Sequence, residues 1–96
     1  MRCEFSAALW RWEARPDLWV FVSLPLPQSQ EIADVPRPRS GFGAVPVRVR
    51  CGTSTWTTSI FPGADGAYVL PLKKAVREAQ GLELGDVARF SLELLG

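Results

Sequence analysis

Residues 53–81 read TSTWTTSIFPGADGAYVLPLKKAVREAQG, and this stretch holds the signals that decide the fold. β-Branched side chains dominate residues 53–60 and predict a strand. Asp65-Gly66 is a strong hairpin signal, and residues 67–70 then predict a second strand. Pro71 ends this strand and opens a helix, because the first turn of a helix tolerates a residue without an N–H group. The stretch therefore indicates a mainly β protein with a helix inserted between its strands.

The helix is expected over about residues 72–80. Apolar residues recur there at the spacing i, i+3, i+4, i+7, which places them on one helix face: Leu72, Ala75, Val76 and Ala79. Gly81 follows as the residue best suited to a left-handed C-cap. A tight turn at Gly85-Asp86 and a strand over residues 87–94 complete this half of the chain.

The N-terminal half begins with two predicted strands. Residues 3–12 alternate between two faces and predict a strand, and residues 14–17 (ARPD) predict a turn. Residues 18–24 form a nearly continuous apolar run, which predicts a strand buried on both faces with Trp19 in the core.

A helix, a loop and a third strand follow in this half. Two helical turns at most fit residues 28–34, and a loop fits residues 35–43. The alternation over residues 45–51 predicts a half-buried strand whose outer face carries Arg48 and Arg50.

The two halves share short motifs as well as the order of their elements. Leu24-Pro25-Leu26 recurs as Leu70-Pro71-Leu72, and Trp10 recurs as Trp56 at the same offset. We interpret this pattern as a weak internal duplication of a β-β-α-β unit.

The duplication suggests how the strands are arranged. Residues 3–51 and 53–95 each supply three strands, and closing six short strands into a barrel removes exposed edges. We therefore expect a single domain over residues 1–96. Its fold class would be mainly β, a six-stranded closed or nearly closed barrel with one short helix and one longer helix at about 72–80.

Three segments resemble one known family. Residues 58–81 (TSIFPGADGAYVLPLKKAVREAQG), 84–87 (LGDV) and 19–25 (WVFVSLP) resemble the domain of unknown function 1905 family. The resemblance implies a barrel related to the AbrB-like double-split barrels, which use a Gly-Asp turn similar to Gly85-Asp86. It implies no agreed biochemical activity and no catalytic residues.

The composition is that of an ordinary globular protein. The 96 residues carry a formal net charge of +1, with 47% hydrophobic and 22% charged residues. A dedicated nucleic-acid binder usually has a larger basic excess, although a balanced total is compatible with a local basic face. No run of about twenty apolar residues is present, so we expect no membrane span. Because the N-terminal residues lack an apolar leader, we expect a cytoplasmic protein in which Cys3 and Cys51 stay reduced and face inward.

The sequence offers little that points to catalysis. It has no histidine and no Cys-x-x-Cys or His-x-His spacing, and neither cysteine has an evident base to activate it. Asp65 and Asp86 are an acid–base pair in principle, but each adjoins glycine in a tight turn, where aspartate usually caps the backbone. We therefore expect no enzyme, and no catalytic, cofactor-binding or metal-binding residues.

The basic residues are the first group of binding candidates. One positive patch for an anion or a nucleic acid would combine helix and strand cations: Lys73, Lys74, Arg77, Arg48 and Arg50. A solvated helix face, balanced by Glu78, is the simpler interpretation of the helix cations.

Tryptophan supplies the second candidate, because four tryptophans are many for 96 residues. Trp10 and Trp12 share one face of the first strand, opposite Phe5 and Leu9. If that face is buried they belong to the core, and if it is exposed they form an apolar patch that needs a partner. We favour an exposed or half-exposed Trp12.

The leading hypothesis is a non-catalytic binding module for a protein, a peptide or a small ligand. The alternative is an AbrB-like nucleic-acid-binding protein that uses its basic helix face, which the modest net charge disfavours. We expect no cofactor and no membrane partner. The internal duplication favours a monomer, with a dimer as the alternative.

Overall fold

The computed structural model describes residues 1–12, 19–36 and 43–95. The turn expected at residues 14–17 and residues 37–42 of the expected loop lie outside these ranges. Within them the strands are β1 (Arg2–Ala8), β2 (Trp10–Arg11), β3 (Val20–Ser23), β4 (Val45–Cys51), β5 (Ser54–Pro62), β6 (Tyr68–Pro71) and β7 (Val87–Leu94). The helices are α1 (Leu26–Ala33), between β3 and β4, and α2 (Lys74–Gln80), between β6 and β7.

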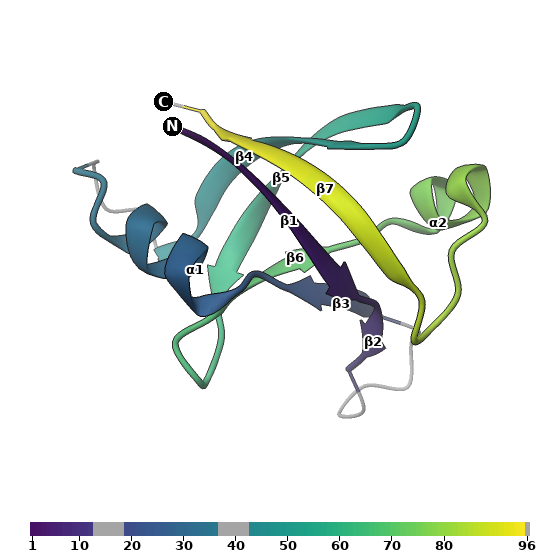
Figure 1. Cartoon of the computed structure of the whole chain (residues 1–96), viewed down its shortest axis with the longest axis horizontal. Helices are drawn as coiled ribbons and strands as arrows, with labels where there is room; N and C mark the ends of the chain where they lie inside the picture. The colour runs from purple at the N-terminus through teal and green to yellow at the C-terminus, as the bar shows by residue number, and fades with distance from the viewer. Residues whose placement is uncertain (13–18, 37–42, 96) are drawn as a thin grey trace.

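The described strands form one antiparallel sheet that curls into an open half-barrel (Figure 1). Its strand order is β1-β7-β4-β5-β6-β3-β2, so the two strands at its ends are neighbours in the chain. The sheet has seven strands instead of the six that we predicted, and it is an open half-barrel instead of a closed barrel.

The additional strand arises because the first predicted strand is divided at Leu9. β1 pairs with β7, whereas β2 pairs with β3, so the chain changes partners at this residue. The backbone of Leu9 bonds instead to the turn before β7: its N–H donates to the Asp86 carbonyl, and its carbonyl accepts from the Gly85 N–H. The alternation of residues 3–12 was visible in the sequence, but the change of partner was not.

The core lies on the inner side of the sheet and follows the predicted alternation most clearly in β4. Val45, Val47 and Val49 are fully buried, whereas Arg48 and Arg50 are exposed. The neighbouring strand β7 repeats the pattern, with Phe90 and Leu92 buried. Apolar burial of this kind is the main stabilising contribution to a domain of this size.

The two helices lie at opposite ends of the molecule (Figure 1). Helix α1 follows Pro25 and buries Ser29 and Ile32, which are one turn apart. Helix α2 ends at Gly81, whose φ of 63° is the left-handed conformation predicted for its C-cap.

The apolar stripe predicted for the second helix is only partly buried. Val76 is buried within α2, and Leu72 is buried just before its first turn. Ala75 and Ala79 are exposed, because the helix packs on the sheet through one narrow side, against β5. Its link to β5 is polar: the Gln80 side chain donates to the hydroxyls of Thr53 and Ser54.

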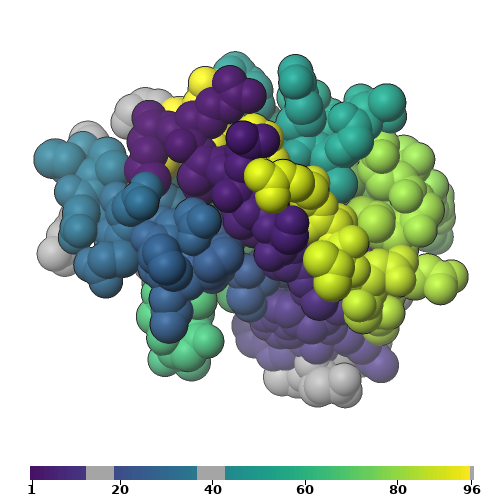
Figure 2. Space-filling model, in the orientation of Figure 1, coloured from purple at the N-terminus to yellow at the C-terminus, as the bar shows by residue number. Residues whose placement is uncertain are grey.

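The ends of the described chain lie together. Arg2 in β1 pairs with Glu93 in β7, and these two strands cross one face of the molecule side by side (Figure 2). Neither helix in the described ranges has the length and apolar character needed to cross a membrane.

Candidate functional site

Four aromatic side chains gather on the outer side of β2 and β3, and we call them the aromatic face: Trp10, Trp12, Trp19 and Phe21. Val20 points into the core, so the side chains of its two neighbours in the chain, Trp19 and Phe21, point outward. Trp10 lies opposite Phe21 in the ladder, and the Trp12 N–H extends the pairing by donating to the Trp19 carbonyl at 2.9 Å. Antiparallel pairing therefore brings residues that precede and follow residues 13–18 onto one surface.

Phe21 is the centre of the aromatic face. Its ring centroid lies 5.2 Å from that of Trp10, 5.7 Å from that of Trp12 and 6.3 Å from that of Trp19. Phe21 is only 4% exposed, whereas the three tryptophans are 37%, 43% and 41% exposed in chain order. The tryptophans thus cover Phe21 and present their own outer surfaces to solvent.

The exposure of the tryptophans confirms the expectation for Trp12 and corrects the one for Trp19. Trp19 was predicted to be in the core, but it lies just before β3 and is 41% exposed. Trp10 is held by a hydrogen bond from its indole N–H to the Ser23 hydroxyl at 3.0 Å. β2 is the last strand in the order of the described sheet, so the aromatic face lies at its end.

The apolar surface continues across β6 into β5. Pro71 lies opposite Phe21, Val69 lies opposite Ser23, and Phe61 lies opposite Val69. Phe61 is 40% exposed. The register therefore extends the aromatic face along the outer side of neighbouring strands.

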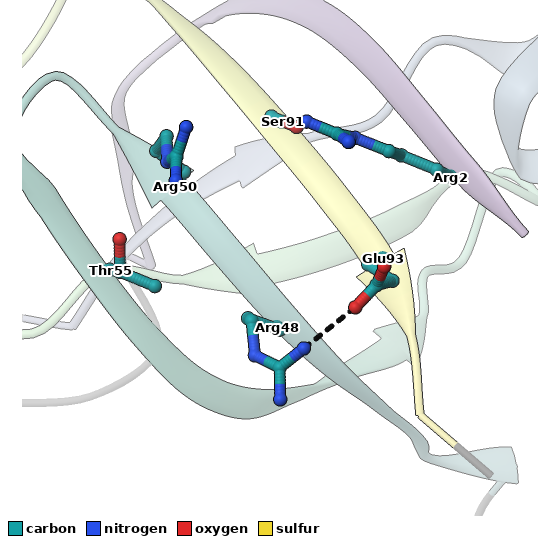
Figure 3. Close-up of a pocket in the computed structure, with 6 residues that line it drawn as sticks. All are labelled: Arg2, Arg48, Arg50, Thr55, Ser91 and Glu93. Carbon is teal, nitrogen blue, oxygen red and sulfur yellow. Dashed lines mark hydrogen bonds and ion pairs between the residues drawn. The ribbon is translucent and has the colours of Figure 1, made fainter.

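A second candidate surface lies on the other half of the sheet. It is a hollow that we call the arginine groove (Figure 3). It is a hollow of about 190 Å³ lined by residues from four strands: Arg2, Arg48, Arg50, Thr55, Ser91 and Glu93. Arg48 donates to Glu93 at 2.7 Å, and both side chains are about half exposed. Sequence reasoning identified Arg48 and Arg50 but missed Arg2, because only the pairing of β1 with β7 places it here.

Of the five basic residues predicted to form one patch, Arg48 and Arg50 line the arginine groove. None of the described lining residues of the arginine groove comes from α2. Lys74 pairs with Glu78 at 3.7 Å one turn along the helix, and the Arg77 guanidinium donates to the Leu72 carbonyl at 3.3 Å. Lys73 is the N-cap residue of the helix. Lys74 and Arg77 therefore each have a partner within or next to their own helix.

The two aspartates considered for catalysis cap turns. The Asp65 carboxylate accepts from the Ala67 N–H at 3.1 Å, and the Asp86 carboxylate accepts from the Glu83 N–H at 2.8 Å. Within residues 1–12, 19–36 and 43–95, no cluster of histidine, cysteine, aspartate or glutamate side chains is suited to hold a metal ion.

Both cysteines are free thiols that face the core, as predicted: Cys51 is buried and Cys3 is half-buried. Burial raises the pKa of the Cys51 thiol, and burial together with the Glu31 carboxylate raises the pKa of the Cys3 thiol. Since the thiolate is the reactive form, neither thiol has the environment of a nucleophile.

We expect iodoacetamide at about pH 8 to alkylate both thiols more slowly in the folded protein than in the urea-unfolded chain. Because the pKa of each thiol is higher in the folded than in the unfolded state, the protonated thiols make stability depend on pH. Their contribution is fully present below the pKa of the unfolded thiol and is lost as the pH rises through the pKa of the folded thiol. Mass spectrometry of quenched samples measures the two rates. Equal rates in the two states would show that burial does not protect the thiols.

Comparison of the chain with known protein families identifies one match. The family model described as Domain of unknown function (DUF1905) matches residues 5–92, a range that includes α1, α2 and most of the sheet. No curated protein matches the chain. Because the matched range spans nearly the whole chain, the protein belongs to the DUF1905 family.

Proposed function

We propose that this protein is a non-catalytic binding module that captures an extended peptide segment of a partner protein on its aromatic face. The observation that carries the proposal is the exposure of three neighbouring tryptophans around a buried Phe21. Contiguous exposed apolar surface marks interaction sites, and tryptophan is enriched among the residues that dominate binding energy.

The angles between the rings favour a peptide over a flat ligand. Trp12 and Trp19 meet edge to face at 84°, and Phe21 is tilted by 57° from Trp12 and by 48° from Trp19. These rings are inclined to one another and form no flat platform, which suits proline and aliphatic side chains better than the flat face of a base or a sugar. Aromatic-lined surfaces of this kind recognise proline-rich segments in the polyproline II conformation.

The indole N–H of Trp12 supplies a polar contact for the same ligand. Trp12 is the most exposed of the tryptophans, and its indole N–H has no acceptor within the described part of the chain. An exposed indole N–H beside apolar rings is well placed to donate to a peptide carbonyl, since tryptophan combines a large apolar surface with one donor. In the proposed complex the aromatic rings therefore pack against the peptide, and the Trp12 indole N–H orients it.

Other features support parts of the proposal. The free thiols of Cys3 and Cys51 are in keeping with a reducing, cytoplasmic compartment. The resemblance to AbrB-like barrels favours the alternative, a nucleic-acid-binding protein. That alternative has weaker support, because a nucleic-acid backbone requires cations along one track, whereas none of the helix cations is among the described lining residues of the arginine groove.

Trp12→Ala is expected to weaken the binding of short proline-rich peptides by about tenfold or more. Intrinsic fluorescence measures this binding, because three of the four tryptophans lie on the aromatic face. Leu26→Ala is the matched control: Leu26 is 61% exposed on α1, outside the aromatic face, and its loss should leave affinity unchanged. Glycine-serine peptides of the same length serve as reference ligands.

Circular dichroism of each variant separates loss of binding from loss of folding. If Trp12→Ala is unfolded, Trp12→Phe retains an aromatic ring without the indole N–H and is expected to weaken binding by a smaller factor. The proposal is wrong if no proline-rich peptide binds more tightly than the glycine-serine peptides. It is also wrong if Trp12→Ala and Leu26→Ala, both folded, have the same affinity as the unmodified protein.

A further inference from the structure

The arginine groove is hollow because a small residue lies among long ones. Ser91 of β7 lies opposite Arg50 of β4, and Arg50 in turn lies opposite Thr55 of β5. Figure 3 shows the Arg2 side chain extending from β1 toward Ser91. The long arginine side chains thus flank a floor formed by short hydroxyl side chains, which leaves the hollow of about 190 Å³.

The lining of the arginine groove has more positive than negative charge. Its charged groups are the guanidiniums of Arg2, Arg48 and Arg50 and the carboxylate of Glu93, an excess of two positive charges. In the described ranges Glu93 forms an ion pair with Arg48, whereas Arg2 and Arg50 have no ion pair. The modest net charge of the whole chain therefore conceals a local positive potential.

We propose that the arginine groove is a second binding site, for the phosphate group of a small molecule. This inference goes beyond the function proposed for the aromatic face, and no residue belongs to both surfaces. A phosphate monoester carries a charge of about −1.5 to −2 near pH 7, which matches the excess in the groove better than a singly charged carboxylate does. Guanidinium groups bind phosphate oxygens through paired N–H donors, and the hydroxyls of Ser91 and Thr55 add further donors.

Glu93 has a positioning role in this site. Its position between Arg2 and Arg48 in the ladder lets it orient the Arg48 guanidinium, and its negative charge lowers the attraction for an anion. Glu93→Gln keeps the shape of the side chain and removes that charge. The variant is therefore expected to bind phosphate about threefold to tenfold more tightly, an effect opposite in sign to that of removing an arginine.

The test is a titration of the full chain with inorganic phosphate at about pH 8, where phosphate is mostly doubly charged, observed by backbone amide NMR shifts. Amide signals of residues lining the groove are expected to move, and Arg50→Ala or Arg2→Ala should weaken the binding by about tenfold. Arg89→Ala is the matched control, because Arg89 is an exposed arginine on β7 that does not line the groove. It should leave the affinity unchanged. Sulfate should bind like phosphate, and acetate should bind at least about tenfold more weakly.

Three outcomes would overturn the assignment. Equal weakening by Arg50→Ala and Arg89→Ala would show diffuse attraction to a basic surface. Absence of any shift in the groove signals would show that no phosphate site exists. Tight binding of duplex DNA that displaces phosphate and weakens steeply with salt would assign the groove to nucleic acid. None of these results affects peptide capture by Trp12, so the proposal for the arginine groove and the proposal for the aromatic face are tested independently.

Discussion

Phe90→Ala is expected to lower the free energy of unfolding by about 3–5 kcal/mol, a large share of the stability of a small domain. Phe90 is fully buried in β7, and its ring stacks on Phe5 of β1 with centroids 5.5 Å apart. These two residues are also partners in the ladder between the strands. Removing the ring therefore leaves a cavity where β1 and β7 pack against the core.

Urea unfolding followed by tryptophan fluorescence measures this loss, and thermal unfolding should show a drop of more than about 10 °C. Val87→Ala is the control on the same strand, because Val87 is 69% exposed and should change stability by no more than about 0.5 kcal/mol. If Phe90→Ala does not fold, Phe90→Leu removes less volume, is expected to cost less than the alanine variant and keeps the prediction testable. Similar losses for positions 87 and 90 would mean that the inner side of β7 is not the core.

Ser29→Ala is expected to lower the free energy of unfolding by about 1–3 kcal/mol. Ser29 is a polar residue of α1 that is only 1% exposed. Its hydroxyl accepts from the buried Tyr68 N–H at 3.0 Å and donates to the Leu24 carbonyl at 3.4 Å. One side chain therefore connects α1 to β6, and the substitution removes an acceptor from a buried backbone donor. Alanine has the higher helix propensity, so the loss would occur despite a small local gain.

Ser6→Ala provides the reference for this measurement. Ser6 is exposed on β1, so the same chemical change there should alter stability by no more than about 0.5 kcal/mol. Chemical unfolding of the two variants under identical conditions gives the difference. Equal values would show that the hydrogen bond from Tyr68 to Ser29 contributes nothing to stability.

The features predicted correctly depend on neighbours in the sequence. The alternation of residues 45–51 was sufficient to assign the valines of β4 to the core and Arg48 and Arg50 to the outer side. The left-handed C-cap at Gly81 and the turn-capping role of Asp86 follow from local backbone geometry in the same way. In each case the decisive interactions span only a few residues.

The features predicted wrongly depend on pairing between distant segments. Trp19 belongs to an apolar run that is typical of a buried strand, but its exposure is set by whether another strand covers that face. The surroundings of Arg48 and Arg50 depend on pairing in the same way: β1 and β7 supply the other charged residues that line the arginine groove. Arg2 could be placed beside them only once its partner in the ladder, Glu93, was known.

From the sequence alone it follows that this protein is mainly β, where most of its strands and helices lie to within a few residues, and which side of the strand over residues 45–51 faces the core. Periodicity and turn chemistry depend on residues close together in the chain, so they can be identified from the sequence. The tertiary structure alone decided that the sheet is an open half-barrel, that Leu9 marks a change of strand partner, and that Trp10, Trp12 and Trp19 share one exposed face. These outcomes depend on strand order and register, and register is set by contacts between residues far apart in the chain.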